Sequence, residues 1–145
     1  MVDPGAFRQI VLNLLDNAVK YGPAGQTITV TLARSHQRAR LMVDDEGPGV
    51  APRDRVRIWE AFFRLESAIT SAVAGSGIGL SVVAELVALH DGRAWVEDVP
   101  HGRGARFIVE LPALDVRQQP GEPGVYAALP AGPPARETLS EQPTT

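Results

Sequence analysis

Three polar side chains recur along a segment that also carries a regular apolar pattern. Asn13, Asn17 and Lys20 stand at positions i, i+4 and i+7, so a helix would place them on one face. Amide oxygens suit Mg²⁺ as neutral ligands, and a lysine one turn further along suits a phosphate group. Taken alone, the same stripe is more often a solvated helix face.

Two glycine-rich segments offer further binding groups. Asp45 opens the run DEGPG at the end of an expected strand, where its carboxylate can accept a hydrogen bond from an exocyclic amine such as that of adenine. Segment 75–80 (GSGIGL) opens an expected helix, and backbone N–H groups at such a start favour an anion. Its spacing fits neither the dinucleotide fingerprint nor the P-loop. In isolation, the first run is typical of a turn and the second of a flexible hinge.

A fourth segment, residues 58–64 (IWEAFFR), joins apolar residues to Arg64. The apolar residues are equally typical of a core, whereas the arginine that follows them can reach a terminal phosphate.

The elements that must position these residues follow from the periodicity of apolar residues. Residues 4–21 predict a helix, with Asp3 as its N-cap and Pro4 at its first position. Further helices are predicted at 52–63 and 78–90, and strands at 27–34, 39–45, 94–99 and 105–111. We therefore expect an α+β, two-layer sandwich with a mixed β-sheet and helices on one face.

Composition bounds the function. Hydrophobic residues make up 44% of the 145 residues, and charged residues 21%, which suits one globular domain. A net charge of -3 gives no basic field for nucleic acid or a membrane surface, and the absence of cysteine excludes disulfides. We expect a cytoplasmic domain over residues 1–112 and a proline-rich, disordered tail over residues 113–145.

Taken in order, the four segments resemble a known family. NLLDNAVKYGP, DDEGPGV, IWEAFFR and GSGIGLSVVAELVALHDG are similar to the N, G1, F and G2 boxes of sensor histidine kinases. These boxes belong to the Bergerat-type ATP-binding fold, which gyrase, chaperone and mismatch-repair ATPases share. The resemblance covers about residues 3–112. It implies a catalytic domain that is N-terminally truncated, because the family's first strand or two have no counterpart, and the open sheet edge would invite pairing.

The resemblance implies a role for each matched residue, with ATP and Mg²⁺ as cofactors. Asn17 would ligate Mg²⁺, Lys20 would contact phosphate, Asp45 would recognise the adenine amine, and Arg64 would approach the γ-phosphate. The catalytic set is Asn17, Lys20 and Arg64, and a lid is expected at about residues 65–76. The implied nucleotide contacts are Asn13, Asn17, Lys20, Tyr21, Asp45, Gly47, Gly49, Gly75, Gly77, Gly79 and Leu80.

The implied activity is transfer of the γ-phosphoryl group of ATP to a histidine on a dimerisation segment, in trans or upstream, with a response regulator as an indirect partner. Related ATPases and anti-sigma serine kinases usually carry Glu where this chain has Asn13, which cannot accept a proton. That difference favours the histidine-kinase branch. His36, His90 and His101 are interpreted as surface or capping residues. The remaining alternatives are a simple ATPase, an anti-sigma kinase and a non-catalytic binding module, in a fragment, a shortened gene product or half of a split kinase.

Overall fold

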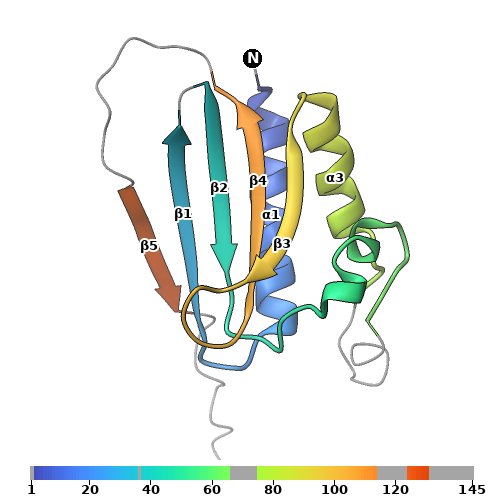
Figure 1. The fold of residues 1–145 in the computed structure, drawn as a ribbon, viewed down its shortest axis with the longest axis vertical. Coiled ribbons are helices and arrows are strands. Elements are labelled where there is room, and N and C mark those ends of the chain that lie inside the picture. The colour runs from blue at the N-terminus through green and yellow to red at the C-terminus, as the bar shows by residue number, and fades with distance from the viewer. Residues whose placement is uncertain (1, 36, 66–74, 114–123, 131–145) are drawn as a thin grey trace, which may run out of the picture.

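The computed structural model describes residues 2–35, 37–65, 75–113 and 124–130, and it confirms the two-layer α+β architecture. Figure 1 shows the two long helices on the same face of one sheet, in which the strand order is β3-β4-β2-β1-β5. The elements are α1 (Pro4–Tyr21), β1 (Thr27–Ser35), β2 (Arg38–Asp44), the 3-10 helices η1 (Pro52–Asp54) and η2 (Arg57–Trp59), α3 (Gly79–Leu89), β3 (Arg93–Asp98), β4 (Ala105–Pro112) and β5 (Gly124–Pro130).

Helix α1 begins and ends where the sequence predicts. Asp3 caps its start, because the Asp3 side chain accepts a hydrogen bond of 2.7 Å from the backbone nitrogen of Ala6. At the other end, Gly22 is extended and its N–H still donates to the carbonyl of Ala18. The helix thus ends at Tyr21, with Gly22 as its C-cap.

The sheet differs from the expected mixed sheet, since every strand pairing among the described residues is antiparallel. The connection that contains α3 leads from β2 to β3, and these two strands are not neighbours in the sheet. A short turn then returns the chain as β4, which fills the position between them. The helical crossover therefore never joins neighbouring strands, which a parallel pair would require.

The predicted helix over residues 52–63 is also wrong. The segment forms two separate 3-10 turns, η1 and η2, and the chain becomes extended at Glu60. Phe62 has a φ of 66°, and its N–H donates to the carbonyl of Gly77 at 3.0 Å. The extended backbone at Glu60 and the positive φ of Phe62 interrupt any helix here, and the hydrogen bond to Gly77 ties the segment to the residues that precede α3.

Residues 124–130 differ from the expected disordered tail, because they form β5 along the outer edge of β1. The pairing runs from Thr27 opposite Pro130 to Leu32 opposite Gly124, with an irregularity between Thr29 and Thr31. An edge strand presents unpaired N–H and C=O groups, so an extended segment nearby can complete the ladder. The rest of the predicted tail, residues 114–123 and 131–145, lies outside the described residues.

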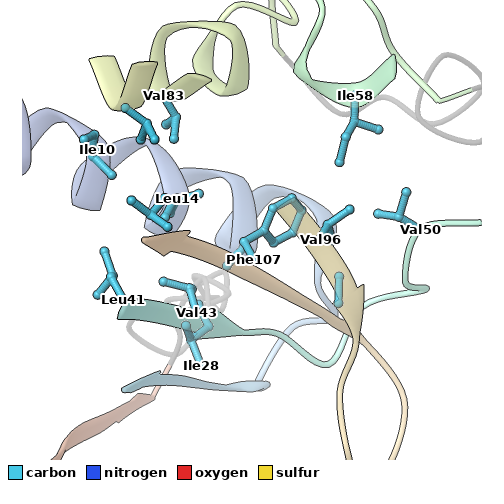
Figure 2. Packing of buried hydrophobic residues seen from close by; sticks show 14 of the residues in the cluster. Ile10, Leu14, Ile28, Leu41, Val43, Val50, Ile58, Val83, Val96 and Phe107 are labelled. Carbon is cyan, nitrogen blue, oxygen red and sulfur yellow. The ribbon is translucent and has the colours of Figure 1, made fainter. Parts of the chain in front are cut away.

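The main core lies between the helices and the sheet. Figure 2 shows Ile10 and Leu14 of α1 and Val83 of α3 on one side, with Leu41, Val43 and Phe107 of the strands on the other. At one end of this layer, Val50 and Ile58 complete the packing near Val96. Burial at i, i+4 and i+8 of α1 (Ile10, Leu14 and Ala18) follows from the apolar stripe of the sequence.

The opposite face of the sheet carries a buried carboxylate. Glu110 is 3% exposed, and its two oxygens each lie 2.6 Å from an arginine, Arg40 on β2 and Arg93 on β3. Both guanidinium groups also lie over the ring of Trp95. Hydrogen bonds from Arg93 and Arg40 hold the pKa of Glu110 below its ordinary value. The cluster stabilises β2, β4 and β3 as a unit on the side away from the helices.

Candidate functional site

A pocket of about 330 Å³ lies where α1, the loop after β2, η2 and the start of α3 meet. We call it the central pocket. It brings together several residues that the sequence singled out from separate motifs, namely Asn17, Lys20, Tyr21, Asp45, Gly49 and Leu80. The other lining residues are Gly22, Pro48, Val50, Ile58, Phe63, Leu65, Ala105 and Phe107.

Asp45 is the buried charged group of this pocket, with 5% of its surface exposed. Its Oδ1 accepts hydrogen bonds from the backbone nitrogens of Gly47 at 2.9 Å and Ala105 at 3.1 Å. Among the described residues no donor contacts Oδ2, so this oxygen retains its capacity to accept. Burial raises the pKa of Asp45, against the two backbone hydrogen bonds, and the charge of Asp44 raises it further.

Two glycines allow the chain to close around Asp45. Gly47 has no room for a side chain, because a Cβ there would lie 2.9 Å from the carbonyl oxygen of Tyr21. Gly104, in the turn before β4, has a φ of +140°, and a Cβ would lie 1.8 Å from the carbonyl oxygen of Asp45. Sequence reasoning singled out Gly47 and missed Gly104, since the register that brings the β3–β4 turn against Asp45 is not a local property.

Lys20 and Asn17 line the pocket from the C-terminal half of α1. The ammonium group of Lys20 lies 2.7 Å from a carboxylate oxygen of Asp16, in a pair whose side chains are 38% and 61% exposed. Exposed pairs of this kind contribute only about 0–1 kcal/mol, so another anion can replace Asp16. Gly75 lies close to the same end, since a Cβ on it would lie 4.0 Å from both the Lys20 Nζ and the Tyr21 hydroxyl.

Asn13 lies one turn away and joins the two helices. Its amide nitrogen donates to the carbonyl of Gly79 at 3.1 Å, and its Oδ1 accepts from Gln9 at 2.9 Å. Gly77 has a φ of +73° and packs on the backbone of Phe62. Asn13, Gly77 and Gly79 thus hold the start of α3 in place without lining the central pocket, and their nucleotide contacts remain predictions.

Arg64 lies outside the central pocket, in an adjacent cavity. Arg53 and Arg57 line that cavity as well, and Phe63 and Leu65 border both spaces. The adjacent cavity is therefore rich in cationic groups beside an apolar boundary. Most of the predicted lid, residues 66–74, lies outside the described residues.

The apolar wall of the pocket is what sequence reasoning missed. Val50, Ile58, Phe63 and Phe107 are core-type residues in the sequence, and they lie where the core layer ends at the pocket. Alternation along β4 indicates that Phe107 faces the helices, but only the packing of η2 against α3 shows that this position borders an opening. An apolar wall with one buried polar group suits a flat, mainly apolar ligand.

Comparison with known proteins identifies the class. Residues 2–115 match the family described as histidine kinase-, DNA gyrase B-, and HSP90-like ATPase. The chain belongs to this family, and it is an ATP-binding ATPase domain. The expected fold class and the resemblance drawn from the four boxes are thereby confirmed.

Within the family, several curated proteins that are similar to this chain are sensor kinases. The chain is 44% identical over 111 residues to the adaptive-response sensory kinase SasA of Trichormus variabilis, covering 76% of this chain and 27% of SasA. It is 40% identical over 102 residues to the sensor-like histidine kinase SenX3 of Mycobacterium bovis, covering 70% of this chain and 25% of SenX3. The chain thus spans about a quarter of the length of these curated relatives.

Two solved structures are also similar to this chain. The mycobacterial sensor histidine kinase MprB is similar at a TM-score of 0.66 and 34% identity, over 76% of this chain and 72% of that one. Full-length ShkA in complex with AMPPNP is similar at a TM-score of 0.62 and 41% identity, over 74% of this chain and 21% of that one. Within the described part of this chain, no helix has the length and apolar character needed to cross a bilayer.

Proposed function

We propose that the central pocket binds ATP, with the adenine amine donating a hydrogen bond to Asp45. The observation that carries this proposal is the buried carboxylate whose Oδ1 is held by two backbone N–H groups while Oδ2 keeps its capacity to accept. The apolar wall, which includes Ile58, Phe63 and Phe107, suits the faces of a flat base. Similarity to ShkA, which was solved in complex with AMPPNP, supports the same ligand class.

Lys20 lines the same pocket and would supply the positive charge that the phosphates need. We propose that it exchanges its partner Asp16 for phosphate oxygens when nucleotide binds, because the existing pair is exposed and weak. Backbone N–H groups at the start of α3 would add donors to the same phosphates. Arg64, in the adjacent cavity, is proposed to approach the γ-phosphate.

Mg²⁺ fits this donor set as an ion that arrives with the nucleotide. In the described ranges no group of three or more Asp, Glu, His or Cys side chains could hold a metal. One neutral ligand, Asn17, suits a cation that keeps most of its ligands from water and phosphates. When bound, Mg²⁺ supplies positive charge that offsets the charge on the phosphate oxygens.

The reaction we propose is transfer of the γ-phosphoryl group to a histidine on a separate dimerisation segment, as the names of the relatives indicate. A nitrogen–phosphorus bond forms while the bond from the γ-phosphorus to the bridging oxygen breaks, and ADP leaves with that electron pair. Asn13 stands where a proton acceptor would be needed for attack by water or serine. The histidine and its base are therefore supplied by the partner segment, and a response regulator accepts the group afterwards. Since ATP is the donor, we place the reaction in the cytoplasm.

Titration calorimetry with ATP, ADP and GTP, with and without Mg²⁺, tests the binding step. We expect both adenine nucleotides to bind more tightly than GTP, which presents a carbonyl where adenine presents an amine. Equal affinity for GTP would exclude the proposed role of Asp45.

Incubation with γ-labelled ATP tests the transfer. We expect no label on the chain alone, and acid-labile label on an added histidine-bearing segment of a related sensor kinase. A segment whose histidine is replaced by alanine is the control. Acid-stable label on the chain itself would indicate a serine-directed kinase. ATP binding without transfer to any histidine segment would favour a non-catalytic binding module.

A further inference from the structure

Gln26 lies buried between the two parts of the chain that build the central pocket. It precedes β1, and only 2% of its surface is exposed. Its amide nitrogen donates to the carbonyl of Ala18 in α1 at 2.7 Å. Its amide oxygen accepts from the backbone nitrogen of Glu46, directly after Asp45, at 3.0 Å. One side chain therefore connects the last turns of α1 to the loop that carries Asp45.

The surroundings of Gln26 are shaped to hold it. A Cβ at position 22 would lie 2.0 Å from the amide of Gln26, so Gly22 leaves the space that the side chain fills. The carbonyl of Ala18 also accepts the helix-ending hydrogen bond from Gly22 at 3.1 Å. The side chain of Glu46 accepts from the backbone nitrogen of Thr27 at 3.2 Å, so a second hydrogen bond connects the same loop to the start of β1.

The two parts of the chain that Gln26 joins carry the groups that we propose for binding the phosphates and the base, respectively. Helix α1 contributes Asn17, Lys20 and Tyr21, and the loop contributes Asp45. The sites of the two hydrogen bonds are adjacent in sequence to these groups, since Ala18 follows Asn17 and Glu46 follows Asp45. A shift of the loop relative to α1 would change the separation between the groups for the base and those for the phosphates.

We propose that Gln26 is a positioning residue of the nucleotide site, which fixes the Asp45 loop against the end of α1 so that base and phosphates are bound together. The proposal rests on the function proposed above. The backbone N–H of Glu46 bonds to Gln26 in partly buried surroundings, and a side chain that cannot accept leaves this N–H without that partner. The carbonyl of Ala18 would keep only its hydrogen bond from Gly22. The loop then loses its connection to α1 and keeps its hydrogen bond to Thr27, and a small displacement of a recognition group costs affinity steeply.

The test measures base discrimination, defined as the ratio of the GTP to the ATP dissociation constant, in the full chain. Gln26→Met has a similar shape and neither hydrogen bond. We expect ATP binding to weaken about tenfold and the ratio to fall toward one. The control is Val87→Ala, at the far end of α3, which removes buried volume away from the pocket. It should lower the melting temperature and leave the ratio unchanged.

A double-mutant cycle with Asp45→Asn separates positioning from general destabilisation. In the Gln26→Met background, Asp45→Asn should cost less ATP affinity than in the wild type, because Asp45 is already misplaced. In the Val87→Ala background it should cost the full amount. Additivity with Gln26→Met, together with an unchanged ratio, would assign Gln26 a purely structural role and overturn the proposal.

A second variant covers the case in which Gln26→Met fails to fold. Gly22→Ala keeps every polar group and displaces the Gln26 amide by steric contact, so the ratio should fall with it as well. A ratio unchanged in Gly22→Ala would also overturn the proposal. Failure of the proposed function gives a different result, since wild-type chain would then show no discrimination between ATP and GTP.

Discussion

Replacing Asp45 by asparagine should lower the preference of the central pocket for a base that carries the adenine amine, without unfolding the domain. The amide oxygen of the new residue can still accept from the backbone nitrogens of Gly47 and Ala105, which lie 2.9 and 3.1 Å from the present Oδ1. The amide nitrogen takes the place of Oδ2. The pocket would then present a donor where the adenine amine also donates.

The expected loss of ATP affinity follows from leaving two donors, the adenine amine and the new amide nitrogen, without an acceptor. A buried polar group that loses its partner costs about 1–3 kcal/mol, which weakens ATP binding about 5- to 150-fold. Inosine triphosphate carries a carbonyl in place of the adenine amine, so Asp45→Asn converts an unfavourable contact with it into a hydrogen bond. The ratio of the ITP to the ATP dissociation constant should therefore fall by about tenfold or more.

The stability of the variant should move in the opposite direction to its ATP affinity. Burial raises the pKa of Asp45, so the folded domain holds the ionised form less readily than the unfolded chain does. This carboxylate lowers the free energy of unfolding at neutral pH, and protonation restores it as the pH falls through the raised pKa. Asp45→Asn removes the buried charge, and the melting temperature should stay equal or rise.

Calorimetry with ATP and ITP measures the two dissociation constants, and thermal denaturation measures the melting temperature. Asp44→Asn is the matched control, because Asp44 pairs with Arg106 at 2.7 Å and is not among the residues that line the central pocket. It should keep both nucleotide affinities. Equal loss of ATP and ITP binding by Asp45→Asn, with an intact melting curve, would refute recognition of the adenine amine.

Three further outcomes are expected. Asn17→Ala should abolish the increase in ATP affinity that Mg²⁺ produces and leave Mg²⁺-free ATP affinity within about twofold of the wild-type value. Calorimetry with and without EDTA measures both affinities, and equal losses in the two conditions would contradict a metal role for Asn17. Glu110→Gln should lower the free energy of unfolding by about 1–3 kcal/mol at pH 7. Since the pKa of Glu110 is lowered in the fold, the difference should shrink as the pH falls below about 4, and a pH-independent difference in denaturant titrations would contradict the ion pairs. Ending the chain at Ala113 removes β5 and opens the edge of β1, so light scattering should show concentration-dependent association; an unchanged monomer of equal stability would show that the edge needs no cover.

The sequence predicted the parts of the fold that depend on local pattern. The apolar stripe and the caps of α1, and the alternation in β1, β2 and β4, led to bounds within one or two residues of those observed. The break-up of the predicted helix over residues 52–63 depends on non-local contacts, namely the packing of η2 against α3 and the hydrogen bond from Phe62 to Gly77. Strand β5 could not be predicted either, because its pairing depends on the free edge of β1 more than on its own short pattern.

The candidate site shows the same division. Motif resemblance indicated Asn17, Lys20 and Asp45, and the structure places all three around one pocket. Gln26 carries no motif and stands in a polar turn, so no sequence rule separates it from a solvated glutamine. Its buried position depends on the space beside Gly22 and on the register that brings Glu46 next to β1.

Under the proposed function, different residues of the described part of the chain hold different parts of ATP. Asp45 would recognise the base, Lys20 would supply positive charge, and Asn17 would be a neutral amide ligand for the metal. Asn13, one turn before Asn17, donates its amide N–H to the carbonyl of Gly79, so this side chain serves helix packing, and an amide is not a proton acceptor. Phosphoryl transfer depends chiefly on positioning and charge stabilisation, and these are the contributions that we propose for this chain. Under the proposed function, the nucleophile and its base arrive together on the partner segment, which makes consumption of ATP conditional on docking of that segment.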